Sequence, residues 1–258
     1  MISVLRIWTI ATNTVREAIR SKLLYTLLFF AILLIATGVI LSTLSYVERE
    51  RILQDVGLAA IRLFGAGIAI FVGVGLIHNE VERRTIQTIL SKPLSRAEFL
   101  LGKFVGLVLT VWLQLLIMGA AFVAVSMISG APVDAGHAAA ILLIGVELML
   151  IVAVATLFSS FTTPLLASLF SVGLYAVGHL TRDLRQLGEQ ADLENVGRAA
   201  WLLHRLLPDL ESFNLTIQAT HGLPIPASEI WLPVLYGLGY SGILLGIATF
   251  LFERRDFR

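Results

Sequence analysis

The chain has 258 residues, of which 57% are hydrophobic and 14% are charged, with a mean hydropathy of +0.87 and no cysteine. Soluble domains carry about 25% charged residues, so this composition indicates a membrane protein. It excludes a disordered chain, a disulfide-stapled secreted domain and a cysteine-ligated metal or iron–sulfur site. The net charge of +1, from 19 basic and 18 acidic residues, excludes a general attraction to nucleic acid.

Residues 1–22 predict an amphipathic helix at the membrane surface. Apolar side chains recur at three- and four-residue intervals from Val4 to Ile19, and the same segment carries Arg6, Arg16, Arg20 and Lys22. A helix with one apolar and one basic face lies in the interface between lipid headgroups and acyl chains. We therefore expect this segment to lie on the membrane and not to cross it.

Six later segments are expected to cross the membrane. A helix needs roughly 20 apolar residues to span a hydrocarbon core of about 30 Å. The predicted crossings, in chain order, are 23–44, 57–77, 104–128, 138–158, 164–180 and 230–252. The fifth is the shortest, and it is expected to span with local thinning of the bilayer. The fold class is thus an all-α integral membrane protein, with one transmembrane domain over residues 1–258.

The division of basic residues predicts the orientation. Six crossings place both termini on one side, and the cytoplasmic side of a membrane protein is the side richer in Lys and Arg. The side with the termini holds twelve, namely Arg6, Arg16, Arg20, Lys22, Arg83, Arg84, Lys92, Arg96, Lys103, Arg254, Arg255 and Arg258. The other holds seven, namely Arg49, Arg51, Arg62, Arg182, Arg185, Arg198 and Arg205. Both termini are therefore expected in the cytoplasm, with the protein in the plasma (inner) membrane.

Two connections are long enough to have structure of their own. In residues 78–103, on the cytoplasmic side, a short helix is expected to end at Pro93, because the residue before a proline avoids helical geometry. Ser95, followed three residues later by Glu98, has the spacing of a capping box and predicts the start of a second helix. The other long connection, residues 181–229, is expected to lie over the outer mouth of the bundle.

Motifs for chemistry within the chain are missing from the sequence. The phosphate-binding pattern Gly-x-x-x-x-Gly-Lys-Ser/Thr does not occur, so the chain is not expected to hydrolyse ATP by itself. The His-Glu-x-x-His pattern of zinc proteases is missing too, and the five histidines are scattered. We expect neither a catalytic residue nor a cofactor or metal site. Gly65, Gly67, Gly73 and Gly75 are interpreted as small residues that let helices approach closely.

Glu147 is the one acidic residue within a predicted crossing, near the centre of 138–158. An ionised carboxylate there costs about 2.5–3.5 kcal/mol or more. It is therefore expected to be protonated, paired with another helix or exposed to a wet cavity. Two roles stay open: translocation or proton handling, and a structural hydrogen bond to another helix. The first gives an alternative function for the whole chain, an ion-coupled carrier or channel that uses Glu147 and has no ATPase partner.

The segment from Glu82 to Lys103 carries a recognisable pattern. It reads Glu82-Arg83-Arg84-Thr85-Ile86, then Leu90-Ser91-Lys92-Pro93-Leu94-Ser95-Arg96, and ends at Gly102-Lys103. It resembles the cytoplasmic loop of ATP-binding cassette (ABC) transporter permeases of the type-2 class, with Thr85 where many members have glycine. The layout of an amphipathic helix, six crossings, an outer loop and a basic tail resembles that family too.

The resemblance implies the permease subunit of an ATP-driven exporter, which is not itself an enzyme. It implies a separate ABC ATPase subunit that binds ATP and Mg, and a second permease copy or homologue beside it in the lipid bilayer. The loop is then a coupling helix that docks on the ATPase, through Glu82, Arg83, Thr85, Leu90, Pro93, Ser95, Arg96 and Lys103. The alternative for this loop is binding to anionic lipid headgroups through its basic residues. Substrate is expected to meet apolar surface on the second and fifth crossings.

Overall fold

The computed structural model describes residues 4–44, 48–82, 95–180 and 207–254, and these residues form helices and no strand. The helices are α1 (Val4–Ile19), α2 (Lys22–Ser42), α3 (Arg49–Gly67), α4 (Gly73–Glu82), α6 (Arg96–Ile128), α7 (Ala135–Phe161), α8 (Pro164–His179), α11 (Thr216–Thr220) and α12 (Ala227–Arg254). A π-helical turn, η1 (Ile68–Val72), joins α3 to α4, and a 3₁₀ turn, η2 (Leu210–Phe213), precedes α11. The all-helical fold class is confirmed for this part of the chain.

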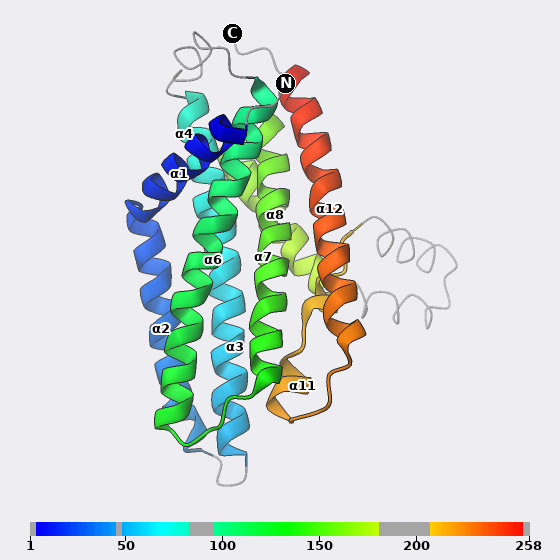
Figure 1. Cartoon of the computed structure of the whole chain (residues 1–258). Coiled ribbons are helices and arrows are strands. Elements are labelled where there is room, and N and C mark those ends of the chain that lie inside the picture. Colours follow the sequence, from blue (N-terminus) through cyan, green and yellow to red (C-terminus); the bar gives the residue numbers. More distant parts are fainter. Residues whose placement is uncertain (1–3, 45–47, 83–94, 181–206, 255–258) are drawn as a thin grey trace, which may run out of the picture.

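The long helices lie side by side in one bundle (Figure 1). One end of the bundle, called here the α1 end, holds α1, the start of α6, the end of α12 and the turn between α7 and α8. The opposite end, the α11 end, holds α11, the end of α2, the start of α3 and the connection from α6 to α7. The first and last described helices thus reach the same end, as the predicted topology requires.

Five of the described helical stretches are long and apolar enough to cross a membrane. They are α2, the stretch Arg49–His78 through α3 and η1, α6, α7, and α12 as far as Glu253. They correspond to the predicted first, second, third, fourth and sixth crossings. Two of them begin well before the predicted boundaries, since Arg49–His78 starts before residue 57 and α6 starts before residue 104. The apolar run therefore predicts where each helix lies, but a helix can begin earlier in the chain because its first turn is polar.

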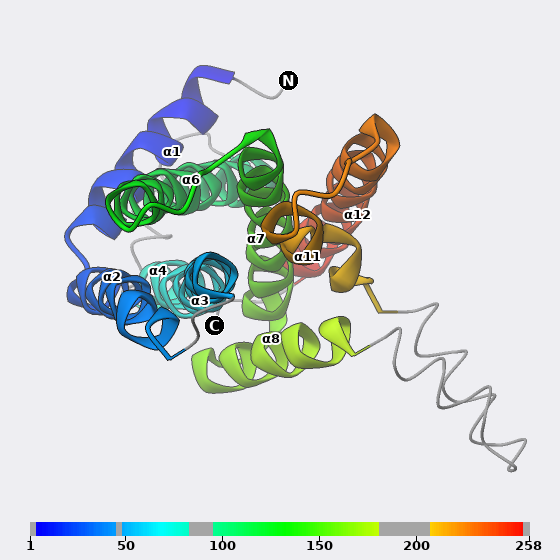
Figure 2. The ribbon, with the colours of Figure 1, turned by 90° about the horizontal axis from the view of Figure 1, so that it is seen from below.

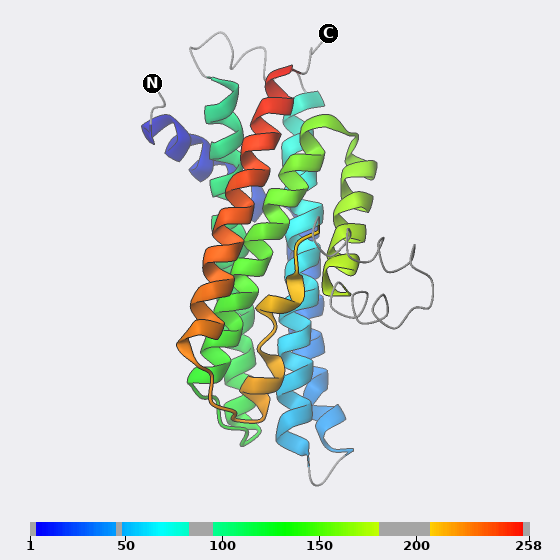
Figure 3. The same cartoon turned by 90° about the vertical axis from the view of Figure 1, so that its right-hand side faces the viewer.

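α8 differs from the predicted fifth crossing. It has 16 residues against 27 in α7, so it is about 24 Å long where α7 is about 40 Å. α8 runs back along α7 from the turn at the α1 end, and it stops part way along the bundle (Figure 3). The described residues after 206 continue from that level to α11. α8 is therefore a shorter apolar helix than the other predicted crossings, and the count of six crossings stays a prediction.

α7 forms the centre of the bundle (Figure 2), where it packs against α3, α6, α8 and α12. Within the most apolar part of each helix, 72% of α7 is buried but only 22% of α2 and of α12. The outer helices expose large apolar side chains such as Phe29 on α2 and Trp231 and Leu235 on α12. A contiguous exposed apolar surface of this kind is suited to contact with lipid or with another membrane protein.

α1 packs across α6 through glycines on α6. A Cβ atom built at Gly106 would lie 2.6 Å from the carbonyl oxygen of Ala11, and one at Gly102 would lie 2.7 Å from Cβ of Ile10. Glycines four residues apart on one helix face let two backbones approach closely. The inner face of α1 buries Ala11, while Trp8 on the outer face is exposed. The amphipathic pattern of the sequence therefore has a packing partner in α6.

Capping boxes fix where α6 and α7 begin. The predicted one is present: the Glu98 backbone N–H donates to Ser95 Oγ at 3.1 Å, and the Ser95 N–H donates to Glu98 Oε2 at 3.0 Å. At α7 the same arrangement joins Asp134 and His137. The side-chain hydrogen bond with His137 lowers the pKa of the Asp134 carboxyl. Because N-cap groups satisfy backbone donors that otherwise lack partners, they hold the helix start in place.

Candidate functional site

The structure describes four of the eight predicted coupling residues. Glu82 is the last residue of α4. Ser95, Arg96 and Lys103 lie at or near the start of α6, at the α1 end. The others fall outside the described residues, and their roles stay predictions: Arg83, Thr85, Leu90 and Pro93.

Arg96 joins the start of α6 to the end of α12. Its Nη1 donates to the carbonyl oxygens of Phe252 at 3.1 Å and Glu253 at 3.0 Å. Carbonyls in the last turn of a helix lack intrahelical donors and carry the negative end of the helix dipole, so a guanidinium suits them. The rings of Phe99 and Phe252 stack beside this contact, with centroids 6.1 Å apart.

Two ion pairs join the same part of α6 to α1. Lys103, only 1% exposed, has Nζ 3.3 Å from Oε2 of Glu17. Arg6 Nη1 lies 3.7 Å from Oε2 of the buried Glu98. A buried ammonium or carboxylate is stable only with an opposite charge nearby. We call Ser95, Arg96, Glu98 and Lys103 the α6 junction, because these residues cap α6 and connect it to α1 and α12.

A second group of charged residues lies inside the bundle around Glu147. The Glu147 side chain is fully buried near the middle of α7. Its Oε2 lies 3.2 Å from Nε of Arg62 on α3, and its Oε1 lies 3.0 Å from Nε2 of His179 at the end of α8. Of the three situations considered for this carboxylate, the structure shows pairing with other helices.

The contacts continue from His179 to the segment after α8. His179 Nδ1 lies 3.4 Å from Oε2 of Glu211 in η2, and Glu211 Oε1 accepts a hydrogen bond from Nδ2 of Asn214 at 2.7 Å. The Tyr175 ring packs edge-on against the His179 ring, with centroids 4.7 Å apart. Arg62, Glu147, His179 and Glu211, called here the buried charge cluster, therefore connect four elements: α3, α7, α8 and η2.

Arg62 was predicted to lie on the outer side, and this prediction was wrong. With the second crossing assumed to begin at residue 57, Arg62 was near its outer end. The helix in fact begins at Arg49, so Arg62 lies well inside the bundle and opposite Glu147. Removing it from the outer seven leaves six basic residues there against twelve on the side with the termini. The corrected count strengthens the predicted asymmetry.

Gly65 brings α3 close to α7 beside this pair. A Cβ atom at Gly65 would lie 2.6 Å from Cδ1 of Leu148, the residue after Glu147. At Gly67 and Gly73 the nearest atoms are 3.8 Å away, and at Gly75 none lies within 4 Å. The predicted close approach is therefore confirmed at Gly65 alone. Gly65 comes one helical turn after Arg62 and lies on the same face of α3. The close approach of the two helices at Gly65 therefore sets the distance between Arg62 and Glu147.

A Gly65→Val substitution is expected to lower the free energy of unfolding by about 1–3 kcal/mol, because the added methyl groups push α3 from α7 and lengthen the Arg62–Glu147 contact. The measurement is thermal unfolding of the purified protein in detergent. Gly75→Val is the matched control, since a Cβ there meets open space. Equal losses in both variants would show that valine acts through helix propensity and not through packing against Leu148.

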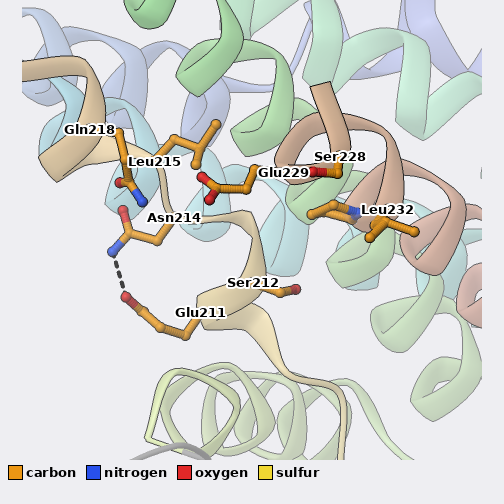
Figure 4. Close-up of a pocket in the computed structure, with 9 residues that line it drawn as sticks. Glu211, Ser212, Asn214, Leu215, Gln218, Ser228, Glu229 and Leu232 are labelled. Atoms are coloured by element: carbon orange, nitrogen blue, oxygen red, sulfur yellow. Dashed lines mark hydrogen bonds between the residues drawn. The ribbon is translucent and has the colours of Figure 1, made fainter. Parts of the chain in front are cut away.

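A pocket of about 350 Å³, lined by both polar and apolar side chains, adjoins the buried charge cluster (Figure 4). Its walls come from η2, α11 and the start of α12: Glu211, Ser212, Asn214, Leu215, Gln218, Ser228, Glu229, Leu232 and Pro233. The close-up shows the hydrogen bond between Asn214 and Glu211 at one side of the pocket. A pocket of this size has room for water, which its polar side chains can bind by hydrogen bonds. Glu211 thus belongs to both the pocket and the cluster.

The protein-family model described as "ABC-2 family transporter protein" matches residues 8–257 of the chain, from within α1 to beyond the end of α12. The chain belongs to the ABC-2 transporter family. The resemblance drawn from residues 82–103 and from the chain layout is thereby confirmed. A comparison with individually curated proteins finds no match.

Membership of the ABC-2 family makes the chain an integral membrane transport protein. Its apolar helices, with lipid-compatible outer faces on α2 and α12, agree with this assignment. Both the α6 junction and the buried charge cluster lie within the residues that match the ABC-2 family. The sequence pattern indicated part of the α6 junction, whereas Glu147 alone indicated the buried charge cluster.

Proposed function

We propose that this ABC-2 protein is the permease subunit of an ATP-driven exporter in the plasma (inner) membrane. A separate ABC ATPase subunit binds ATP and Mg, and its hydrolysis cycle moves the permease. A second copy of the chain, or a homologue, completes the membrane part. Both termini lie in the cytoplasm, on the side of the ATPase.

The observation that carries this proposal is the α6 junction. Residues 83–94 directly precede Ser95 in the chain, so a displacement of that segment acts first on the start of α6. Arg96 transfers the displacement to the end of α12, and the Lys103–Glu17 pair transfers it to α1. A docked ATPase would therefore move α1, α6 and α12 together, while a passive linker would need none of these contacts.

The distribution of charge supports the orientation. The start of α6 and the end of α12 lie at the α1 end. The connections assigned to this side carry twelve basic residues, and those assigned to the opposite side carry six. Basic residues in short loops are retained on the cytoplasmic side of the membrane. The ATPase is a cytoplasmic protein in this proposal, so it meets the side of the permease that carries residues 83–94.

The alternative is an ion-coupled carrier that needs no ATPase. The buried charge cluster favours it, because charged groups in the middle of a membrane domain mark ion pathways in transporters. The two functions differ in what drives transport. Uptake or export by the purified chain in vesicles, driven by an ion gradient with no ATPase present, would support the carrier.

The test is a pull-down of the tagged full-length chain from native membranes in mild detergent. We expect an ABC ATPase to be recovered with the wild type. Arg83→Glu is expected to reduce that recovery at least tenfold, since it reverses a charge in the predicted coupling segment. Arg49→Glu, an exposed arginine at the opposite end of the bundle, is the matched control and should leave recovery unchanged. Wild-type protein that recovers no ATPase would contradict the permease assignment.

A further inference from the structure

The buried charge cluster has a composition that favours one bound proton. Arg62 contributes a charge of +1, and Glu147 and Glu211 contribute −1 each. With a neutral His179 the sum is −1, and with a protonated His179 it is zero. A net charge inside a membrane domain is costly, whereas a set of paired charges that sums to zero is tolerated. The charge balance alone therefore favours the imidazolium form of His179.

The geometry of His179 leads independently to the same form. Both of its ring nitrogens face carboxylate oxygens, Nε2 at 3.0 Å from Glu147 and Nδ1 at 3.4 Å from Glu211. A neutral imidazole has one N–H donor and one lone pair, while the imidazolium has two N–H donors. A neutral ring would direct a lone pair at a carboxylate oxygen, which repels it. The imidazolium satisfies both sides.

We propose that His179, held between Glu147 and Glu211 inside the membrane domain, is a proton-binding site that exchanges its proton with water in the adjoining pocket. Among the residues that the structure describes, the charged and titratable groups that face it are Arg62 from α3, Glu147 from α7, Tyr175 from α8 and Glu211 from η2. The described residues contain no group of three histidine, aspartate or glutamate side chains arranged to hold a metal ion, and a proton needs no such cage.

Glu211 provides the route between the pocket and His179. A hydronium ion in the pocket gives its proton to the Glu211 carboxylate and becomes water. The protonated carboxyl then passes the proton from Oε2 to Nδ1 of a neutral His179, which becomes the imidazolium, and Glu211 becomes a carboxylate again. One N–H bond forms and one O–H bond of hydronium breaks. Release follows the same steps in reverse.

The bound proton also holds the elements of the cluster together. While His179 carries it, the end of α8 and η2 are attracted to Glu147 on α7. When the proton leaves, His179 has only one N–H left to donate to two carboxylates, and the sum of charges becomes −1. α8 and η2 are then free to move away from α3 and α7. This property belongs to the chain alone and does not rest on the ATPase, so it can fail without affecting the proposed function.

The charge of His179 is measurable by NMR of the full-length protein in lipid nanodiscs, with ¹⁵N-labelled histidine. His179→Gln identifies the signal by its loss. At pH 8, where free histidine with its pKa of about 6.5 is mostly neutral, we expect both nitrogens of His179 to carry protons in the wild type. An unprotonated nitrogen on His179 at pH 8 would overturn the proposal.

Glu147→Gln tests the cause while keeping the size of the side chain. The remaining charges, Arg62 and Glu211, then sum to zero with a neutral ring, so His179 is expected to lose its charge at pH 8. Glu229→Gln is the matched control, because Glu229 lines the same pocket but is not one of the groups that face the histidine; it should leave the signal unchanged. Retention of the charge in Glu147→Gln, or the same loss in Glu229→Gln, would contradict the assignment.

The movement is measurable because the chain has no cysteine of its own. Spin labels on cysteines placed at the exposed positions Leu63 on α3 and Leu169 on α8 report the separation of these two helices. We expect one separation at pH 6 and a second, longer one in Glu147→Gln at pH 8. Identical separations under both conditions would overturn the inference that the proton holds α8 in place.

Discussion

Replacing Glu147 alone by leucine is expected to lower the free energy of unfolding by about 3–5 kcal/mol, the range found when one partner of a buried ion pair is removed. The Arg62 side chain would then remain in the interior without its carboxylate, and His179 would lose one of its two acceptors. The loss is large because Glu147 lies in the most buried helix of the bundle and the Arg62 side chain is only 13% exposed.

The double variant Arg62→Met, Glu147→Leu is expected to recover most of that loss. Buried ion pairs replaced by apolar side chains of similar volume often cost little or even stabilise, and the remaining pair of His179 and Glu211 still sums to zero when His179 is protonated. The measurement is denaturant or thermal unfolding of each variant in the same detergent. Glu229→Leu, an exposed carboxylate at the start of α12, serves as the control and should change stability by about 0.5 kcal/mol or less.

A double variant as unstable as Glu147→Leu would contradict this account of the cluster. If the double variant is stable but transport in the assembled complex is lost, the charges are needed for function and not for folding. The comparison therefore separates the two roles that were left open for Glu147.

Gly106→Leu is expected to have the second large effect, a loss of about 3 kcal/mol in the free energy of unfolding and a loss of ATPase recovery. A Cβ atom there would lie 2.6 Å from the carbonyl oxygen of Ala11, which is backbone and cannot rotate away. Overpacking against side chains costs about 1–3 kcal/mol, and a rigid neighbour places this site at the upper limit. Since α1 must move off α6, the Lys103–Glu17 pair is also broken.

Gly119→Leu on the same helix is the matched control, because a Cβ there has only ordinary contacts with Ile141 at 3.7 Å. Unfolding and the pull-down are measured on both variants. Unchanged ATPase recovery with Gly106→Leu, in protein shown to be folded, would mean that α1 takes no part in coupling.

The positions of the long helices could be predicted because each contains an uninterrupted apolar run, and because Ser95 with Glu98 marks the start of α6. The length of α8 could not. Residues 164–180 are as apolar as a crossing, and hydropathy does not reveal that His179 ends the helix beside the middle of α7. Nor does hydropathy predict where a polar first turn begins, which is why Arg62 was assigned to the wrong level of the second helix.

The buried charge cluster was only partly accessible from sequence. Glu147 stands out because it interrupts an apolar segment, but Arg62 and Glu211 are distant in the chain and look like loop or boundary charges. His179 did have a signal. α7 and α8 form an antiparallel pair around the turn at residues 162–163, and residues equally far from such a turn lie at the same height. Glu147 and His179 are nearly equally far from this turn along the chain, so the antiparallel pairing of α7 and α8 brings them together.

The short length of α8 affects how the chain enters the membrane. A segment needs about 20 apolar residues to partition into a bilayer on its own, and α8 has 16 and ends in a histidine. We expect it to insert as a hairpin with α7, which carries Glu147, after Arg62 on α3 is already in the membrane. Biosynthesis of the last third of the protein therefore depends on the correct placement of the first two thirds.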